Sequence, residues 1–424
     1  MTSSLLAALV AAAPLTMQSA VEEALSSSPE LKAATHRSAS AEAAVDQASS
    51  AYLPRVSVQA QYVARAPKNQ LPIELPPIPG LEPVGDIDDI HHVNADLVLG
   101  YRVLDLSRGA RADAAEAKVQ AARADTDTAK AQLAFGVRAN FLAALYARDV
   151  EKIATASLVV AESDAKRIAL RTEAGVESDV ALAQSRVRVA ELSAQLARAK
   201  NERRRYAEQL MVLLGREAPP EVTGDLAALA AGSALPELDS NPRLTKARHE
   251  RSAALSMAKS ASRGIVPTVD VFGTIGVAYP RALQLELGPV YTFGVKLEWL
   301  AFDGGLRSAQ ADGFEKNAAA VEAMSDATRR ELLRRLAQVE AKEATARADL
   351  ESASRTLEET KVYLRVAKTA VSAGTGTELD VHTAELGLDR AKMAMKKAEL
   401  DIALAQAERL FVHGVAVQTS GSHP

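Results

Sequence analysis

The sequence predicts a mainly α-helical chain with four β-strands, built from two tandem copies of one structural repeat. The first observation is composition: 85 of the 424 residues are alanine, and aromatic residues make up only 4%. Abundant Ala, Glu, Lys, Arg and Leu is typical of long helices that pack closely side by side. The second is a set of ordered matches between the two halves, and the third is apolar–polar alternation in four segments. Length alone would have suggested two or three globular domains.

The composition also excludes several classes of function. The 50 basic and 54 acidic residues give a net charge of −4, which offers no electrostatic reason to expect nucleic acid as a partner. The chain has no cysteine, which excludes disulfides, thiolate metal sites and a cysteine nucleophile. The sequence has no nucleophile–base constellation and no Walker, Rossmann or HExxH pattern. We therefore predict no enzymatic activity, no cofactor and no metal centre.

The first predicted element is an export signal. Residues 1–13 hold an apolar stretch from Leu5 to Val10 that runs into three alanines, as in a signal peptide and its cleavage site. The alternative is the first turns of an alanine-rich helix. No run in the chain approaches the roughly 20 apolar residues of a transmembrane helix. This pattern is still compatible with short membrane-spanning strands.

Short segments of the first half match segments of the second half in the same order and at similar separations, which indicates a duplication. Residues 28–33 match 241–246, residues 53–58 match 266–271, residues 104–111 match 300–307, Gly175 matches Gly374, and Gly215 matches Gly414. We therefore predict repeat 1 at 14–215, a linker at 216–236, repeat 2 at 237–414 and a disordered tail at 415–424.

Each repeat reads as helix, β-hairpin, very long helix, turn and helix. In repeat 1 we predict a helix at 16–53, a hairpin at about 55–104, a long helix at about 105–173, a tip at about 171–179 and a return helix at about 177–214. In repeat 2 the same elements fall at about 239–266, 267–302, 305–373, 372–380 and 378–412. At about 1.5 Å per residue, the long helix of repeat 1 reaches roughly 100 Å and its return helix roughly 57 Å. The first helix has the missing length, so we expect it to stack end to end on the return helix.

The helices keep the spacing of coiled-coil seams. In the last helix, Leu379, Leu386, Met393, Leu400 and Ala407 recur every seven residues. Alanine in such a seam lets helices pack closely, so we predict tight helical hairpins.

The four predicted strands have one apolar and one polar face, because side chains alternate along a strand. One set is polar and we expect it to face a watery lumen: Arg55, Gln59, Asp96, Arg102, Asp270, Lys296 and Glu298. The other set contains the aromatic residues that we expect to face lipid: Tyr62, Tyr101, Tyr279, Tyr291, Phe293 and Trp299. The alternative is a soluble antiparallel sheet packed on helices. Strands of about 10–14 residues are long for a soluble sheet and suit a tilted membrane-spanning one.

Four strands in one chain cannot close a barrel. They leave two open edges, which the interior of a bilayer does not tolerate. Two chains would give eight strands and a packed interior, whereas three would give twelve and room for a lumen. We predict a homotrimer with a 12-stranded β-barrel and a long coiled-coil α-helical barrel.

An ordered set of short motifs resembles the TolC-type outer-membrane efflux proteins. These motifs are residues 16–20 leading to 28–31, residues 52–54, residues 302–305 and the two Gly-x-x-Ser/Thr tips. The resemblance covers nearly the whole chain after residue 13. The chain departs from it in a signal peptide without basic residues, in a long Pro-rich first hairpin loop, and in Ser107-Arg108 where repeat 2 has Asp303-Gly304.

The resemblance implies a trimeric channel-tunnel in the outer membrane of a Gram-negative bacterium, with a periplasmic helical domain. Such proteins are the passive exit ducts of tripartite efflux or secretion systems. They are coupled through a periplasmic adaptor, or membrane fusion protein, to an inner-membrane pump of RND, ABC or MFS type.

Four residues at the tips are candidates for adaptor docking: Gly175, Ser178, Gly374 and Thr377. Their local roles already explain them structurally, because glycine ends a helix at positive φ and Ser or Thr caps the next one. The resemblance adds that the tips form the periplasmic entrance and dock the adaptor.

Five carboxylates fall at the same end of the chain's hairpins: Glu173, Glu177, Asp179, Glu378 and Asp380. Repeated in a trimer, they would form an acidic entrance ring that favours cations. The alternative is that acidic residues complement helix N-termini, which explains Asp179, Glu378 and Asp380.

The first hairpin loop, residues 66–92, is Pro-rich and ends in Asp86, Asp88, Asp89, His91 and His92. Carboxylate and imidazole groups suit a divalent cation, but the spacing matches no metal motif, and a solvated extracellular loop is favoured.

Two other classes of protein compete with the duct. A periplasmic adaptor usually carries one helical hairpin rather than two, and a soluble coiled-coil scaffold leaves the alternating strands unexplained.

Overall fold

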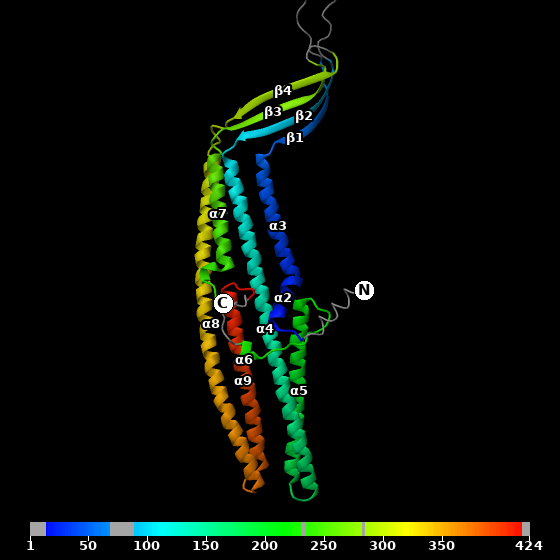
Figure 1. The fold of residues 1–424 in the computed structure, drawn as a ribbon, viewed down its shortest axis with the longest axis vertical. Helices are drawn as coiled ribbons and strands as arrows, with labels where there is room; N and C mark the ends of the chain where they lie inside the picture. The colour runs from blue at the N-terminus through cyan, green and yellow to red at the C-terminus, as the bar shows by residue number, and fades with distance from the viewer. Residues whose placement is uncertain (1–13, 68–88, 230–234, 282–284, 418–424) are drawn as a thin grey trace, which may run out of the picture. The chain divides into compact units, whose positions relative to one another are not determined.

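The computed structural model describes residues 14–67, 89–229, 235–281 and 285–417. Figure 1 shows its helices and strands. The chain divides into two units. Unit 1 comprises Met1–Arg37, Arg123–Lys246 and Ser325–Pro424, and unit 2 comprises Ser38–Ala122 and Ala247–Met324. The predicted signal peptide and residues 418–424 of the predicted tail lie outside the described residues.

The elements follow the predicted order of each repeat. Repeat 1 contains α2 (Met17–Ser27), α3 (Pro29–Ser49), the 3₁₀ turn η1 (Ser50–Tyr52), β1 (Arg55–Ala64), β2 (His91–Leu104), α4 (Ser107–Glu173) and α5 (Asp179–Leu214). The short helix α6 (Leu226–Leu229) lies in the predicted linker. Repeat 2 contains η2 (Leu238–Ser240), α7 (Pro242–Arg263), β3 (Thr268–Tyr279), β4 (Gly288–Glu298), α8 (Leu306–Ser372) and α9 (Glu378–Val412). The two long helices, α4 and α8, have 67 residues each.

The prediction of one continuous N-terminal helix over 16–53 was wrong, because the helix breaks at Ser28. Ser28 has φ −57° and ψ 125°, and Pro29 starts α3. A residue that precedes proline is pushed out of the helical region, while proline itself is tolerated in a first turn. Repeat 2 breaks in the same way, with Asn241 at ψ 131° before Pro242.

The first helix of each repeat meets the end of its return helix, as the length arithmetic predicted. In repeat 1, Ser27 Oγ donates to the carbonyl of Leu214 at 3.0 Å. In repeat 2, Asn241 Nδ2 donates to the carbonyl of Val412 at 2.8 Å. Both bonds satisfy a carbonyl in the last turn of a helix that has no partner within its own helix.

The core of unit 1 contains heptad lines of mainly small residues. Buried residues recur every seven positions in α4 (Ala147, Ala154, Ala161, Ile168), α5 (Ser185, Leu192, Ala199), α8 (Val339, Ala346, Ala353) and α9 (Ala384, Ala391, Ala398, Ala405). The predicted α9 seam was therefore wrong near the tip, where Leu379 and Leu386 are 59% and 41% exposed. Alanine occupies the buried line because it lets two helices approach closely, which leaves the larger leucines on the flank.

The largest apolar cluster of unit 1 surrounds the middle of α4. Val137, Phe141, Leu142 and Leu145 are fully buried there, against residues of α2, α5, α6 and α9. Large apolar residues are thus concentrated in one cluster, whereas small residues line the hairpins.

Unit 2 contains a four-stranded antiparallel sheet in the order β1-β2-β3-β4 (Figure 1). Strand β2 begins at His91, so His91 and His92 belong to the strand rather than to the predicted loop. In this sheet, β1 and β4 are the edge strands. Among the described residues, no helix is both long and apolar enough to cross a membrane.

Candidate functional site

The first helical hairpin turns at Gly175, which adopts φ +70°. The amide of Val176 donates to the carbonyl of Arg171 at 2.8 Å and closes the end of α4. Ser178 then caps α5, because its side chain accepts a bond from the amide of Ala181 at 3.2 Å. The turn therefore follows the predicted sequence of glycine stop and hydroxyl cap.

The second hairpin repeats this turn with a stronger cap. Gly374 adopts φ +73°, and the amide of Thr375 donates to the carbonyl of Ala370 at 2.9 Å. Thr377 and Asp380 form a reciprocal capping box, in which the Thr377 amide donates to Asp380 Oδ2 at 2.9 Å. Hydrogen bonds from the hydroxyl and then the amide of Thr377 lower the pKa of the Asp380 carboxyl.

The five candidate carboxylates at the tips have different surroundings. Glu177 pairs with Arg171 at 3.0 Å, and Glu378 contacts Arg167 at 3.5 Å. Asp380 belongs to the capping box, Asp179 lies in the first turn of α5, and Glu173 ends α4. Within the described residues of one chain, no three acidic or histidine side chains gather as a metal site would require.

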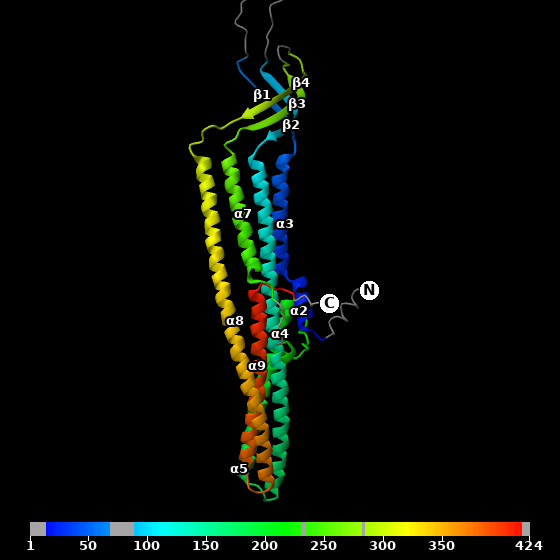
Figure 2. The same cartoon turned by 60° about the vertical axis from the view of Figure 1, so that its left-hand side comes forward.

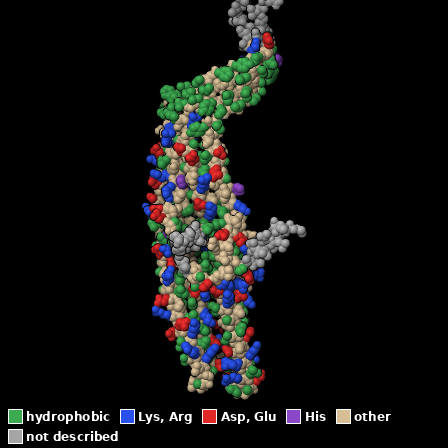
Figure 3. Space-filling model, in the orientation of Figure 1, with side chains coloured by type: hydrophobic (Ala, Val, Ile, Leu, Met, Phe, Trp, Pro, Cys, Tyr) green, Lys and Arg blue, Asp and Glu red, His purple; other side chains and the backbone are tan. Residues whose placement is uncertain are grey.

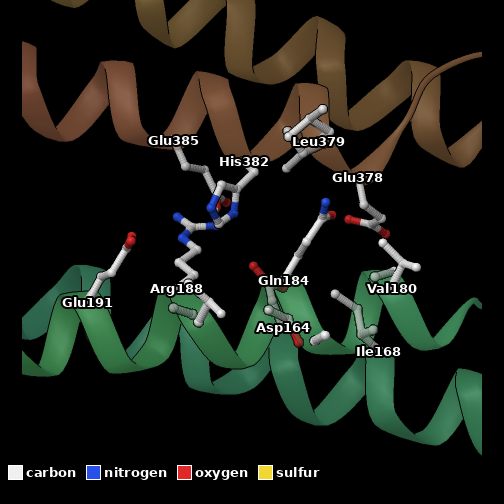
Figure 4. A pocket seen from close by; sticks show the side chains of 16 residues that line it. Asp164, Ile168, Val180, Gln184, Arg188, Glu191, Glu378, Leu379, His382 and Glu385 are labelled. Carbon is white, nitrogen blue, oxygen red and sulfur yellow. The ribbon is translucent and has the colours of Figure 1, made fainter.

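A cleft of about 490 Å³ separates the two hairpins next to their tips (Figure 4). Its lining residues come from α4, α5 and α9, and include Ile168, Val180 and Leu379 beside charged groups. The turns of both hairpins lie at the same end of unit 1 (Figures 1 and 2). The cleft therefore lies where the first hairpin faces the return helix of the second.

A buried ion cluster crosses from one hairpin to the other beside this cleft. Arg188 of α5 lies 2.6 Å from Glu385 of α9, and Lys368 of α8 lies 3.0 Å from the same carboxylate. The Glu385 side chain is only 7% exposed. The mostly buried Arg188 is the main partner that this carboxylate needs, because a buried carboxylate without a partner is strongly destabilising.

His382 completes this cluster as a neutral ring. Arg188 Nη1 lies 2.9 Å from His382 Nδ1, and a guanidinium can only donate, so Nδ1 accepts. Burial first, and then the charge of Arg188, lower the pKa of His382. This cluster was not predicted from the sequence. Charged residues beside the predicted seams of α5 and α9 were the one feature of the sequence that could have indicated it.

The sheet of unit 2 places the predicted polar residues on one face. Gln59 is paired with Asp96, and Asp96 with Gly276. Arg102 is paired with Asp270, and Asp270 with Lys296. Arg102 Nε donates to Asp270 Oδ1 at 2.8 Å, and Lys296 Nζ donates to Glu298 at 2.9 Å. Arg55 is paired with Gly100, whose neighbour on β3 is Phe272, so this face also carries one aromatic residue that the sequence analysis missed.

The opposite face of the sheet is apolar and exposed. The register places Tyr62, Tyr101, Tyr279, Tyr291 and Phe293 on this face. Phe293 is 73% exposed and lies over Gly273 of β3. Trp299 follows the end of β4 and donates from Nε1 to the carbonyl of Ile265 at 3.0 Å. Figure 3 shows hydrophobic side chains gathered over the strands, in contrast to the mixed charges over the helices.

The candidate metal loop is only partly described. Asp86 and Asp88 lie outside the described residues. Asp89 accepts hydrogen bonds from the Tyr279 hydroxyl at 2.5 Å and from the Ile90 amide at 2.6 Å. His91 shares a hydrogen bond of 2.8 Å with the Tyr62 hydroxyl. These partners explain Asp89 and His91 as residues that hold the end of the hairpin together.

The family model described as outer membrane efflux protein matches residues 20–216 and, again, residues 236–413. The double match confirms the duplication. The search of curated proteins finds no match.

Several solved structures share the fold over nearly the whole chain. CusC, described in terms of transmembrane channel formation, is 16% identical, with 94% of this chain and 92% of that chain covered and a TM-score of 0.79. The outer membrane protein VceC of Vibrio cholerae is 19% identical, with 94% and 96% covered and a TM-score of 0.74. The MtrE outer membrane channel of Neisseria gonorrhoeae is 17% identical, with 95% and 89% covered and a TM-score of 0.76.

Proposed function

The chain belongs to the outer membrane efflux protein family, and we propose that it is the exit duct of a tripartite efflux or secretion system. Three chains would form a channel-tunnel with a 12-stranded barrel in the outer membrane and a helical barrel in the periplasm. Transport through it is passive and is powered by an inner-membrane pump of RND, ABC or MFS type, reached through a periplasmic adaptor.

The observation that carries this proposal is the open four-stranded sheet. Its edge strands β1 and β4 have no strand partner on their outer sides among the described residues. One face exposes large apolar side chains and the other carries charge pairs. A sheet with open edges is unstable in lipid, and closure with further chains removes those edges. The polar face would then line the lumen, and Tyr62, Tyr101, Tyr279, Tyr291, Phe293 and Trp299 would face lipid or its boundary.

Insertion of the purified protein into a planar bilayer tests the duct. We expect stable channels of one conductance level, and outer-membrane fractionation should recover the protein as trimers. A protein that stays in the periplasmic fraction and opens no channel would instead favour a periplasmic adaptor or a coiled-coil scaffold.

The two tips are our candidates for the adaptor-docking surface, with Gly175, Ser178, Gly374 and Thr377 at its centre. A Cβ at Gly374 would meet no atom within 4 Å, so a side chain there would project into open space. Gly374→Trp should abolish efflux while trimers still insert. Gly374→Asn is the matched control, because asparagine tolerates positive φ. Normal efflux by the tryptophan variant would contradict the docking role.

The tip carboxylates are candidates for an acidic periplasmic entrance in the trimer. Neutralising Glu378 and Asp380 together should reduce the preference of single channels for cations. An unchanged reversal potential in a salt gradient would leave these residues with only their capping and pairing roles.

A further inference from the structure

The cleft between the hairpins has the volume of a ligand site. Its volume of about 490 Å³ lies within the roughly 300–1,000 Å³ of pockets that hold drug-sized molecules. Figure 4 shows side chains from facing helices pointing into the same space. A molecule held there would touch both hairpins.

One part of the cleft offers an apolar surface. Val180 and Leu379 lie on facing helices and are 65% and 59% exposed, although both are large apolar side chains. Ile168 of α4 also lines the cleft and is itself buried, so it adds an apolar wall. Covering Val180 and Leu379 would remove apolar surface from water, which favours a ligand with an apolar body.

The rest of the lining carries an excess of negative charge. It contains the carboxylates of Asp164, Glu191, Glu378 and Glu385, against the single guanidinium of Arg188. Glu385 is already compensated by Arg188 and Lys368. Asp164 pairs with Arg167 at 3.1 Å, whereas in the described part of the chain no hydrogen bond or ion pair joins Glu191 to another side chain. With Arg167 and Lys368 counted beside Arg188, four carboxylates face three cations, and this remaining negative charge favours a cation.

Glu378 is the carboxylate best placed to receive that cation. Its one ion-pair contact is with Arg167 at 3.5 Å, which leaves most of its acceptor positions open. It also lies in the first turn of α9, directly before Leu379 and opposite Val180 (Figure 4). Charge and apolar surface thus meet at one place.

We propose that this cleft binds a small organic cation, in which an ammonium group pairs with Glu378 and an aromatic body lies against Ile168, Val180 and Leu379. Such a ligand contacts α4 and α5 of repeat 1 and α9 of repeat 2, so it links the two hairpins and opposes their separation. This last consequence rests on the proposed duct function, whereas binding itself does not.

Calorimetric titration of the purified full-length protein with 1-naphthylmethylamine tests the binding. At pH 7.5 this probe carries an ammonium group and a body of two fused rings. We expect saturable binding at least about tenfold tighter than that of the neutral analogue 1-naphthalenemethanol, because a charge-assisted bond is lost in the alcohol. Equal affinity for the two probes would overturn the proposal.

Three variants locate the site. Glu378→Gln should weaken binding of the amine about tenfold, and Val180→Trp, which fills the cleft without removing charge, should abolish it. Glu351→Gln is the matched control, since Glu351 is an exposed carboxylate of α8 outside the cleft, paired with Arg355. Unchanged affinity in both Glu378→Gln and Val180→Trp would place binding elsewhere and overturn the proposal.

Single-channel recording separates this inference from the proposed function. The amine, but not the alcohol, should reduce the open time of the wild-type channel and leave Val180→Trp unaffected. Binding without any effect on open time would overturn the link between the hairpins. A protein that binds the probe but opens no channel would contradict the duct and leave the site standing.

Discussion

The two repeats share their order of elements and the length of their long helices, yet they bury those helices differently. In unit 1, α4 brings four fully buried residues, Val137, Phe141, Leu142 and Leu145, to the largest apolar cluster. The corresponding part of α8 brings Leu332 to a much smaller cluster with Leu244 and Val412. The largest cluster of unit 1 is therefore built on α4, with Leu400, Ala403 and Ala407 of α9 packed against it. Both long helices also keep large apolar residues exposed, among them Leu170 in α4 and Tyr363 in α8. The two repeats therefore share one topology, but their long helices contribute differently to the apolar core.

The two tips also share one topology but differ in the interactions that stabilise them. The first tip combines a simple cap at Ser178 with the ion pair between Arg171 and Glu177. The second has the reciprocal box of Thr377 and Asp380. A capping box satisfies two amides, whereas a simple cap satisfies one. The second tip should therefore be the more firmly held turn.

Truncation of the core should give the largest difference between the repeats. Phe141→Ala removes a fully buried ring and should lower stability by about 3–5 kcal/mol. Leu332→Ala should cost less, near the lower end of about 2–5 kcal/mol, because its cluster is small and can relax. Thermal unfolding of the two variants in detergent, followed by circular dichroism, compares them. A larger loss for Leu332→Ala would contradict the assignment of the main core of unit 1 to the cluster around α4.

The contact between the repeats should weaken in acid through His382. Its folded-state pKa lies below the ordinary value of 6.5, so the neutral ring is favoured in the folded protein. The stabilisation is therefore complete above about pH 6.5 and is lost as the pH falls through the lowered pKa. A protonated ring would face Arg188 as a second donor. Glu385, Glu191 and Asp164 also act on the ring and favour its charged form, but burial and Arg188 outweigh them.

Hydrogen exchange of α5 and α9 amides between pH 7.5 and 5 measures this effect. Exchange rates corrected for intrinsic pH dependence should rise in the wild type and stay flat in His382→Gln, which keeps a neutral acceptor. Parallel behaviour of the two proteins would exclude His382 as the titrating group.

The caps should give a smaller difference. Ser178→Ala should cost about 1 kcal/mol of local helix stability. Thr377→Ala should cost somewhat more, because the Thr377 hydroxyl caps the helix and also donates to Asp380 Oδ2 at 2.7 Å. Exchange of the first-turn amides of α5 and α9 reports both losses. Equal or reversed losses would show that the capping box adds nothing to the second tip.

The ion pair at the first tip should matter least. Glu177→Gln should lower stability by no more than about 0.5 kcal/mol, because Arg171 is 43% exposed and water screens the pair. The change should disappear in 1 M salt. A loss as large as that of the Ser178 cap would mean that charge, rather than capping, holds the first tip.

The features that the sequence predicted are those set by local rules. Gly175 and Gly374 end helices at positive φ, and the alternation of the strands fixes which residues share a face. The break at Ser28 could also have been predicted, because a proline follows it. By contrast, the pairing of Arg188 with Glu385 joins residues that are distant in sequence, and only the packing of two hairpins brings them together.

An aspartate caps the start of both long helices, but the two aspartates do not align in sequence. Aligning the repeats places Ser107 opposite Asp303 and indicates that the first repeat lacks the aspartate. In the structure, Asp105 takes the role, accepting from the Ser107 amide at 2.9 Å and from Arg111 at 2.8 Å. Asp303 accepts from the Gly305 amide at 3.0 Å and from Arg307 at 2.6 Å. The same cap is built two residues away, which a residue-by-residue match does not detect.

Disulfide trapping between the edge strands tests the central claim most directly, namely that one chain supplies a third of a closed barrel. The natural chain has no cysteine, so every cross-link comes from the introduced pair. One cysteine would replace Val58 in β1, and a second would be moved residue by residue along β4. The account predicts that some positions give covalent dimers and trimers and nothing larger. Failure to cross-link at every position of β4, or a ladder that continues beyond three chains, would contradict it.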